Sequence, residues 1–247
     1  MSCLPIDRDG EGKMTGTFIN IIAILIGSGI GMLFGPRLSD RLKSTVLSGM
    51  GIFTAAVGMQ MFLKTENMLI VLGALILGAV LGEWLKIEDW LQNLGIWIEK
   101  RIPGSSEGGS GRFVRGFLAA SVLYCTGPMA VLGSISDGLS GDYLTLSIKS
   151  VLDGFLSIAF SSTLGIGVAF STLPVFAYQG TITLLAAQLN AIVSAAMMNE
   201  MTATGGILLI GIGISSMLEL KKIRVGNFLP ALAIAPAIVH VLGLITK

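Results

Sequence analysis

One stretch of the chain carries a basic, an acidic and three hydroxyl side chains at helical spacing. These residues are Lys149, Ser150, Asp153, Ser157 and Ser161. Side chains three or four residues apart share one face of an α-helix, and a lysine four residues before an aspartate can pair with it. The pattern predicts a polar face that binds a solute or a coupling ion. The alternative is a buried ion pair that only joins helices.

Asp153 is expected close to the middle of a bilayer. If its helix begins near Tyr143, the aspartate lies about 15 Å along the helix axis. A charge at that depth costs about 2.5–3.5 kcal/mol on insertion scales, so it should face a polar cavity or an opposite charge. This cost favours a functional role for the polar face.

A second candidate site is the motif Thr126-Gly127-Pro128, which lies inside an apolar run. Proline is favoured in the first turn of a helix, so a glycine followed by a proline predicts a helix that breaks and restarts within the membrane. The free amides of such a break bind anionic groups, and its free carbonyls bind cations. A plain proline kink is the alternative.

Further candidate residues follow along the chain. The segment 133–142 supplies the oxygen-bearing side chains Ser134, Ser136, Asp137, Ser140 and Asp142. Oxygens coordinate hard cations, and Asp137 is therefore a candidate binding residue, although an external turn explains the same composition. Asn190 and Glu200 are expected on a sixth helix and at its end, where Glu200 is either a gating acid or an interfacial acid near a helix N-terminus.

The residues that most catalytic sites need are rare in this sequence. It contains one histidine, His240, and two cysteines, Cys3 and Cys125. No nucleophile–base pair, metal-ligand run, phosphate loop or haem motif occurs. We therefore expect no enzyme, no cofactor and no metal site.

The composition indicates that the elements holding these residues lie in a membrane. Of 247 residues, 53% are hydrophobic and 13% are charged, against about 25% charged in soluble domains. The mean hydropathy is +0.82, and the formal net charge is only +1, which argues against a nucleic-acid partner. Because lipid offers backbone groups no partners, continuous apolar runs predict helices. The expected fold is an all-α, polytopic membrane protein with the lipid bilayer as its surroundings.

Charge-free runs of about 20 residues predict eight transmembrane helices. Their expected ranges are 16–35, 45–63, 67–83, 114–135, 143–170, 178–199, 203–219 and 227–245, with Pro174 as the turn between the fifth and sixth. Basic residues concentrate in the loops after the first, third and seventh helices, and such loops favour the cytoplasm. Both termini are then expected outside.

Three segments are expected to differ from the spans. Residues 1–13 form a polar leader, or sequence upstream of a start at Met14. Residues 84–112 hold an amphipathic helix with Trp90 and Trp97, which is expected at the membrane interface, and a Gly/Ser-rich linker. The helices at 114–135 and 143–170 fall within a central unit, 113–175.

The first three helices resemble the last three. Gly51 and Gly58 match Gly206 and Gly213, and the third and eighth helices begin with Asn-Met-Leu and Asn-Phe-Leu. Because the two triplets start on opposite sides, the units 14–83 and 176–247 would form an inverted repeat, as in many secondary transporters. The alternative is that glycine-rich helices look alike.

Glycines four residues apart also recur in the first and third helices. They favour close packing of helices within the chain, with a homodimer seam as the alternative.

Several long motifs resemble one known family. They are GTFINIIAILIGSGIG, CTGPMAVLGSISDGLSGD, KSVLDGFLSIAFSSTLGIGV, NEMTATGGILLIGIG and VGNFLPAL. The chain from Met14 onward is similar to the YdfK/YqgA-like family of bacterial inner-membrane proteins, a family of unknown function. The resemblance implies the fold and the bacterial plasma membrane, and it implies no substrate.

These observations favour a secondary transporter or facilitator for a small solute or ion. Asp153, Lys149 and the serine face would form its site beside Gly127-Pro128, and one repeat would rock against the other. An ion channel and a scaffold or sensor without transport are the alternatives. A scaffold, however, needs no charges in the core of the bilayer.

Overall fold

The computed structural model describes residues 14–37, 39–101, 109–125, 127–218, 220–221 and 223–245, and every regular element in this part is helical. In chain order the elements are α1 (Thr15–Phe34), η1 (Gly35–Arg37), α2 (Asp40–Phe62), α3 (Met68–Leu85), α4 (Ile87–Arg101), α5 (Gly109–Cys125), α6 (Pro128–Ser140), α7 (Leu144–Leu164), α8 (Gly167–Phe170), α9 (Thr172–Leu184), α10 (Ala186–Ile192), α11 (Ala195–Ile212), the π-helical turn η3 (Gly213–Met217), η4 (Val225–Phe228) and α12 (Ala231–Ile245). The expected leader at 1–13 and residues 103–108 of the expected linker lie outside the described residues.

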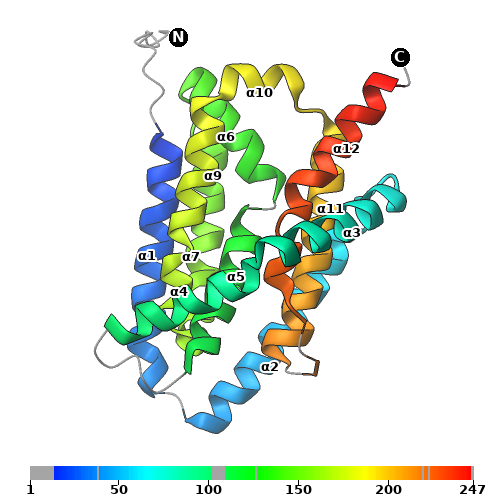
Figure 1. Ribbon diagram of the computed structural model, residues 1–247. Helices are drawn as coiled ribbons and strands as arrows, with labels where there is room; N and C mark the ends of the chain where they lie inside the picture. The colour runs from blue at the N-terminus through cyan, green and yellow to red at the C-terminus, as the bar shows by residue number, and fades with distance from the viewer. Residues whose placement is uncertain are drawn as a thin grey trace, which may run out of the picture.

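The helices form two groups, and α4 crosses the front of the molecule, where it packs on the largely buried α5 (Figure 1). In the first group α1 packs along α7, and α9 packs on α6. In the second group α2 packs on α11, and α3 packs on α12. Buried side chains from both groups, among them Tyr124, Phe160 and Leu209, belong to one connected apolar core.

Glycine allows the paired helices to approach at backbone distance. A Cβ atom on Gly27 or Gly31 would overlap a backbone carbonyl of α7. Gly82 of α3 lies against the backbone of Asn227 in the same way. The glycine stripes therefore pack helices within one chain, which confirms the first of the two expectations for them.

The turn that was expected at Pro174 lies at Gly165. Helix α7 ends at Leu164, and Gly165 has a φ of +73°, a left-handed conformation that strains any residue with a Cβ atom. Pro174 lies in the first turn of α9, where its missing N–H leaves no hydrogen bond unmade. The expectation of one helix over 143–170 is wrong in this respect.

The helix expected at 178–199 is also wrong. Helix α9 ends at Leu184, and α10 bends away from it by 81°. Helix α11 then begins at Ala195, because the Ser194 hydroxyl accepts a hydrogen bond from the Met197 amide and caps it. Glu200 consequently belongs to the seventh expected span, which starts eight residues earlier than the expected 203.

Six helices of the described chain are long and apolar enough to cross a membrane. They are Thr15–Phe34, Ser44–Phe62, Met68–Leu85, Leu144–Leu164, Ala195–Ser215 and Val225–Ile245. Two bent pairs, Gly111–Cys125 with Met129–Ser140 and Gly167–Leu184 with Ala186–Ile192, bring the number to eight if each pair is one span. The all-α membrane fold is confirmed, with six to eight candidate spans.

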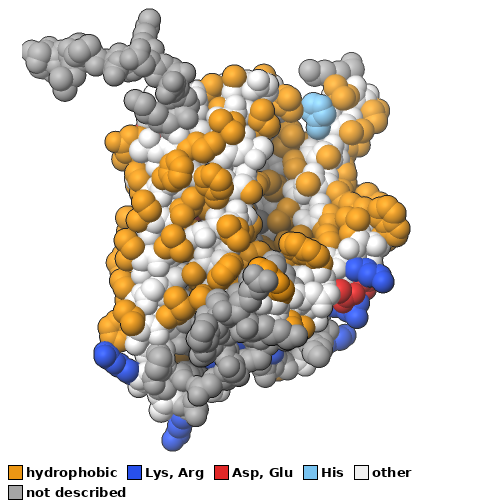
Figure 2. Space-filling model, turned by 60° about the vertical axis from the view of Figure 1, so that its left-hand side comes forward, with side chains coloured by type: hydrophobic (Ala, Val, Ile, Leu, Met, Phe, Trp, Pro, Cys, Tyr) orange, Lys and Arg blue, Asp and Glu red, His pale blue; other side chains and the backbone are white. Residues whose placement is uncertain are grey.

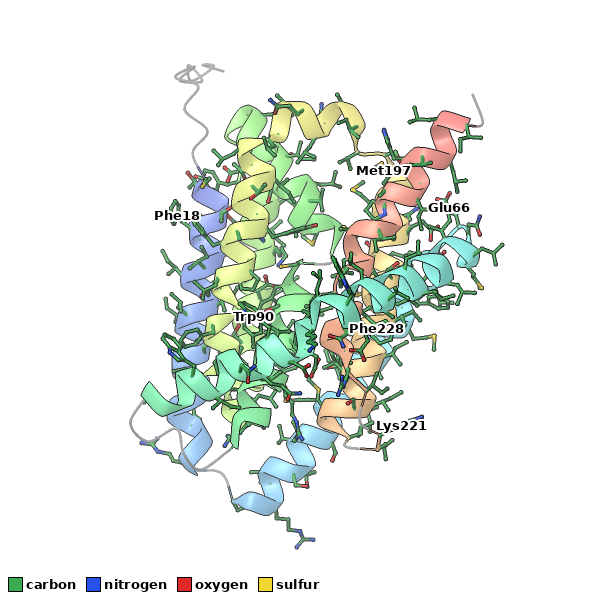
Figure 3. The ribbon with its side chains drawn as sticks, in the orientation of Figure 1. Phe18, Glu66, Trp90, Met197, Lys221 and Phe228 are labelled. Carbon is green, nitrogen blue, oxygen red and sulfur yellow. The ribbon has the colours of Figure 1, made fainter. Side chains whose placement is uncertain are left out.

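The surface is consistent with a lipid environment. Figure 2 shows hydrophobic side chains over most of one face, while the Lys and Arg side chains in view gather toward one end. Exposed apolar residues include Phe18 and Leu33 on α1 and Leu69 on α3. The first turn of α1 and the last turn of α12 lie at the end opposite Lys221 (Figures 1 and 3).

Candidate functional site

The predicted polar face of α7 is buried inside the first group of helices. Lys149 and Asp153 are both buried, and the Lys149 ammonium donates a hydrogen bond to Oδ2 of Asp153. Ser150, Ser157 and Ser161 are buried on the same side of the helix. The structure thus brings together all five residues of the predicted face.

The ion pair lies beside the end of α5. The Tyr124 hydroxyl and Ser157 Oγ are 2.7 Å apart, and Lys149 Nζ is 5.6 Å from the centroid of the Tyr124 ring. An ammonium over an aromatic face at this distance is stabilised by the ring quadrupole. From the other side, the Asn20 amide of α1 lies close to the Asp153 carboxylate. The site is therefore built by α1, α5 and α7.

The helix that ends at Cys125 restarts at Pro128, so the predicted broken helix is confirmed. Helices α5 and α6 meet at an angle of 60°. Gly127 is the N-cap of α6 in an extended conformation, with no side chain bound to the first amides. The break therefore presents uncapped amide donors next to Tyr124, in a span that otherwise offers none. Thr126 lies outside the described residues.

The lower part of the serine face has a packing role. Ser161 Oγ donates hydrogen bonds to the carbonyls of Ser28 and Ser157, at 3.0 Å and 2.6 Å. A Cβ atom on Gly31 would collide with Ser161. This half of the stripe joins α7 to α1, whereas the other half carries the Lys149–Asp153 pair.

The helices α1, α6 and α9, which pack on one another, bury several polar groups that have no hydrogen-bond partner in the described part of the chain. Their side chains are Thr17 and Asn20 of α1, Ser134 and Asp137 of α6, and Gln179 and Thr183 of α9. The carbonyl oxygen of Asn20, both amide atoms of Gln179 and one carboxylate oxygen of Asp137 are unpaired. A buried polar group without a partner costs about 1–3 kcal/mol. A cluster of them indicates a space that water, an ion or a polar solute occupies.

The composition of segment 133–142 was also compatible with an external turn, but Asp137 does not lie in one. It occupies the last helical stretch of α6 and is 1% exposed. Its Oδ2 accepts a hydrogen bond from the Gly16 amide at 3.0 Å, so the carboxylate caps the N-terminus of α1 from another helix. The predicted site residue is thus part of the polar cluster, at its outer end.

Glu200 is buried and binds a loop. Its carboxylate accepts hydrogen bonds from Thr65 Oγ1 at 2.7 Å and from the amides of Glu66 and Asn67 at 2.8 Å and 3.0 Å. Asn199 donates to Glu66, which lies with Met197 at the upper right of Figure 3. Glu200 therefore fastens the loop before α3 to α11, away from the Lys149–Asp153 pair.

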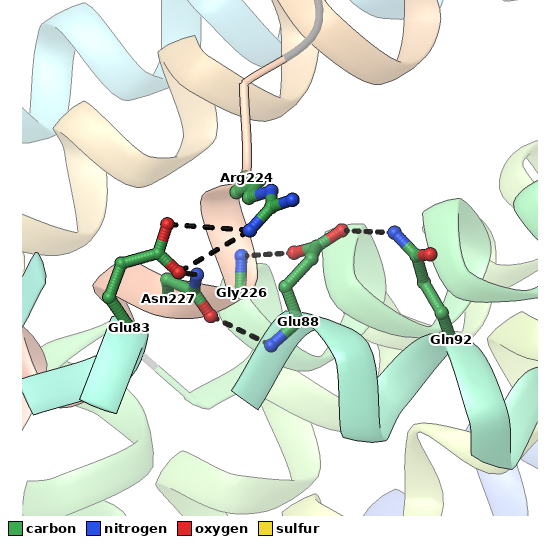
Figure 4. A network of polar contacts seen from close by, with 6 residues as sticks. All are labelled: Glu83, Glu88, Gln92, Arg224, Gly226 and Asn227. Atoms are coloured by element: carbon green, nitrogen blue, oxygen red, sulfur yellow. Dashed lines mark hydrogen bonds and ion pairs between the residues drawn. The ribbon is translucent and has the colours of Figure 1, made fainter. Parts of the chain in front are cut away.

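A second buried carboxylate fastens the start of η4 at the other end (Figure 4). Glu88 Oε2 accepts from the Gly226 amide at 2.8 Å, and the Glu88 amide donates to Asn227 Oδ1 at 2.8 Å. Asn227 also donates to Glu83, which faces Arg224 at 3.4 Å. We call the contacts of Glu200 the outer clamp and those of Glu88 the inner clamp, after the orientation that the basic loops predict. No local pattern predicts the inner clamp, because the residues it joins are 138 or more positions apart in the chain.

A cavity of about 570 Å³ adjoins the inner clamp. It is lined by residues of α4, α5 and the α11–η4 connection, including Gln92, Arg115 and Ser215. Trp90 and Trp97 of α4 are more than half exposed, as expected for an interfacial helix.

Asn190 lies apart from the other predicted site residues. Asn190 lies on α10 and is exposed, so the structure does not bring it into the polar cluster. Within the described residues, no group of three or more His, Cys, Asp or Glu side chains could hold a metal ion.

Four members of the polar cluster escaped prediction as site residues: Thr17, Asn20, Gln179 and Thr183. A signal was present, since each pair is three or four residues apart within an otherwise apolar span. Charge-free runs mark the spans but do not distinguish apolar residues from uncharged polar residues of this kind.

The chain matches a family model described as "Protein of unknown function (DUF554)" over residues 15–240. It is 30% identical to "Uncharacterized membrane protein YdfK" of Bacillus subtilis (strain 168) over 233 residues, which cover 93% of this chain and 97% of that protein. It is 31% identical to "Uncharacterized protein YqgA" of Escherichia coli (strain K12) over 227 residues, 89% and 94% of the two chains. No solved structure matches it significantly. The resemblance found in the motifs is thus confirmed, and the chain belongs to the DUF554 family of proteins of unknown function.

Proposed function

We propose that the protein is a secondary transporter that moves a small solute or ion across the bacterial inner membrane by alternating access. One observation carries the proposal. The buried Lys149–Asp153 pair lies beside the broken helix and next to Asn20 of α1, and α1 and the helices α6 and α9 that pack on it bury further polar side chains without partners. A broken helix and a buried charge close to each other are typical of transport sites.

The unpaired groups argue for transport over a purely structural ion pair. A structural pair is stable when further hydrogen bonds satisfy its atoms and its neighbours. Here Gln179 buries an amide without a partner among the described residues. A site that alternately binds and releases a polar solute needs such groups, since they are satisfied only in one state of the cycle.

The packing of α2 on α11 supports the proposed inverted repeat. If Gly51 corresponds to Gly206 and Gly58 to Gly213, a pseudo-twofold axis exchanges the contact Gly51–Gly213 with the contact Gly206–Gly58. Both contacts occur: a Cβ atom on Gly213 would approach the Gly51 carbonyl at 2.8 Å, and one on Gly58 would collide with the Gly206 carbonyl. Any antiparallel pair brings together residues that are seven apart on each helix, so the support for the repeat comes from the glycines that occupy all four matched positions.

The two clamps supply fastening points for the alternating motion. The outer clamp holds the loop before α3, and the inner clamp holds the start of η4, which leads into α12. These are the third helices of the two proposed repeats. Releasing one clamp while the other stays closed would open the polar cluster to one side at a time.

The proposed orientation follows the basic residues. Arg37 and Lys221 are exposed near one end of the molecule, and positive loops favour the cytoplasm. In this orientation the inner clamp faces the cytoplasm, and both termini lie outside. The proposal needs no catalytic chemistry.

The proposal is tested by flux into proteoliposomes that contain the purified protein. Ion-sensitive dyes report Na⁺ and H⁺, and light scattering reports glycerol and glycine. For the probe that the wild type moves, Asp153→Asn is expected to lower flux at least tenfold, which corresponds to about 1.4 kcal/mol. Ser162→Ala is the matched control, because the Ser162 hydroxyl lies on the exposed side of α7 and bonds only to the Ala159 carbonyl.

The double variant Lys149→Met/Asp153→Asn guards against loss of folding. It leaves no unpaired charge in the core, so a folded but inactive double variant would tie the loss of flux to the site. Equal flux in Asp153→Asn and Ser162→Ala would remove Asp153 from the transport path.

A further inference from the structure

The Asp137 carboxylate is buried with only one of its oxygens satisfied. Oδ2 accepts the Gly16 amide at the start of α1, and the Thr17 amide also interacts with the carboxylate. In the described part of the chain, Oδ1 of Asp137 has no hydrogen-bond partner. The ion pairs found there join Lys149 to Asp153 and Arg224 to Glu83, so neither includes Asp137. The helix N-terminus supplies about half a positive charge, so a negative charge is left partly unbalanced.

Buried hydroxyls without partners lie on the three helices that meet at this carboxylate. Thr17 directly follows Gly16, and Ser134 precedes Asp137 by one helical turn. Thr183 belongs to α9, and its backbone carbonyl lies against Gly138, the residue after Asp137. Each of these hydroxyls is at least 97% buried, and none has a hydrogen-bond partner among the described residues.

The chemistry of this set is that of a ligand shell for a hard cation. Carboxylate and hydroxyl oxygens suit hard cations, and sites for divalent ions generally gather several carboxylates. Here there is one carboxylate with three neutral hydroxyls, and the next acid, Asp142, is exposed. A single negative charge balances a single positive one.

We propose that Asp137, Thr17, Ser134 and Thr183 bind a monovalent alkali cation at the outer end of the polar cluster. The site is separate from the Lys149–Asp153 pair, which is already balanced internally. The ion satisfies Oδ1 and the three hydroxyls at once, and it completes the junction of α1, α6 and α9. The inference rests on the proposed function in one respect: in a transporter this cation is the coupling ion.

The test is thermal unfolding of the purified full-length protein, followed by tryptophan fluorescence in NaCl, KCl or choline chloride at constant ionic strength. Na⁺ or K⁺ is expected to raise Tm relative to choline, by about 4 °C at ten times the dissociation constant. Asp137→Asn is expected to abolish this dependence. The matched control is Asp142→Asn, which retains an oxygen for the Leu144 amide and should respond like the wild type.

Thr183→Val keeps the test decisive if Asp137→Asn fails to fold. Removing an unpaired hydroxyl leaves folding intact, while loss of one ligand should raise the half-saturating cation concentration about tenfold. Equal Tm values in choline and in both alkali salts would overturn the proposal. So would a response only to Mg²⁺ or Ca²⁺, a response to pH alone, or an alkali response that survives Asp137→Asn.

The outcome separates this inference from the proposed function. A cation-insensitive Tm together with flux that depends on Asp153 would remove the cation site and leave transport standing. A cation-dependent Tm together with flux unaffected by Asp153→Asn would leave the cation site and remove the proposed path.

Discussion

At the scale of single residues, the buried polar side chains are of two kinds. Some have hydrogen bonds that join helices, and others have no hydrogen-bond partner among the described residues. The Ser161 hydroxyl shares its hydrogen between two backbone carbonyls, whereas the Gln179 amide has no partner among the described residues. Both are buried polar side chains in apolar helices. Only the difference in satisfaction distinguishes a packing contact from a binding site.

The ion pair permits a direct test of charge balance. Lys149→Met or Asp153→Leu alone leaves one buried charge without its partner and should lower the free energy of unfolding by about 3–5 kcal/mol. The double variant Lys149→Met/Asp153→Leu should lie within about 1–2 kcal/mol of the wild type, because hydrophobic residues replace buried pairs well. Denaturant titration in detergent measures all three, and additive effects of the two substitutions would contradict the pairing.

Sequence reasoning identified the face of α7 but not the residues opposite it. The spacing of Lys149, Asp153 and the serines depends on one helix, so the helical period alone predicts it. Asn20, which lies beside Asp153, comes from α1, and the buried Gln179 comes from α9. Their approach depends on tertiary packing, which no local pattern encodes.

At the scale of elements, glycine decides which helices touch. Helix α1 follows α7 so closely that Gly27 and Gly31 leave no space for a side chain. The same α1–α7 interface also contains Asn20 and Asp153, so the close approach of the two helices positions Asn20 beside Asp153. The glycine stripe is therefore a positioning element for the site.

Alanine substitutions along α1 test this role. Gly27→Ala should destabilise the protein by about 1–3 kcal/mol, because its Cβ would overlap the backbone of Gly154. Gly29→Ala is the matched control, since nothing lies within 4 Å of its added Cβ, and alanine should stabilise the helix by up to about 1 kcal/mol. Thermal unfolding measures the pair, and similar Tm values would contradict the close approach.

Helix boundaries were predicted correctly where charged residues mark the ends of a span. The predictions were wrong where backbone conformation sets the end of the helix. The first helix was expected at 16–35 and lies at Thr15–Phe34. The end of α7 depends on the left-handed backbone of Gly165, in a chain with 33 glycines. Composition offered Pro174 as the more obvious signal, although proline is tolerated in a first helical turn.

At the scale of the whole molecule, the two clamps lie at opposite ends and act on different proposed repeats. Each consists of a buried carboxylate that binds backbone amides, Glu200 for the outer clamp and Glu88 for the inner one. Hydrogen bonds to a charged group are worth about 1.5–3 kcal/mol. Weakening either clamp should therefore shift the balance between outward-facing and inward-facing states.

Labelling of Cys125 at the helix break measures that balance. With Cys3 replaced by serine, an impermeant thiol reagent is applied to vesicles of both orientations. Glu88→Gln should raise labelling from the side of the basic residues by about tenfold, and Glu200→Gln should raise it from the opposite side, since each loses about 1.4 kcal/mol of clamp stability. Changes in the same direction for both variants would contradict alternating access.

Tyr124 lies where the α5–α6 bend meets the ion pair, with its hydroxyl on Ser157 and its ring over Lys149. A movement of α5 that straightened the bend would carry this ring away from the ammonium. The shielding of the charge would then vary with the angle between the two half-helices, and a ligand that displaced the ring from the lysine would change the shape of the span.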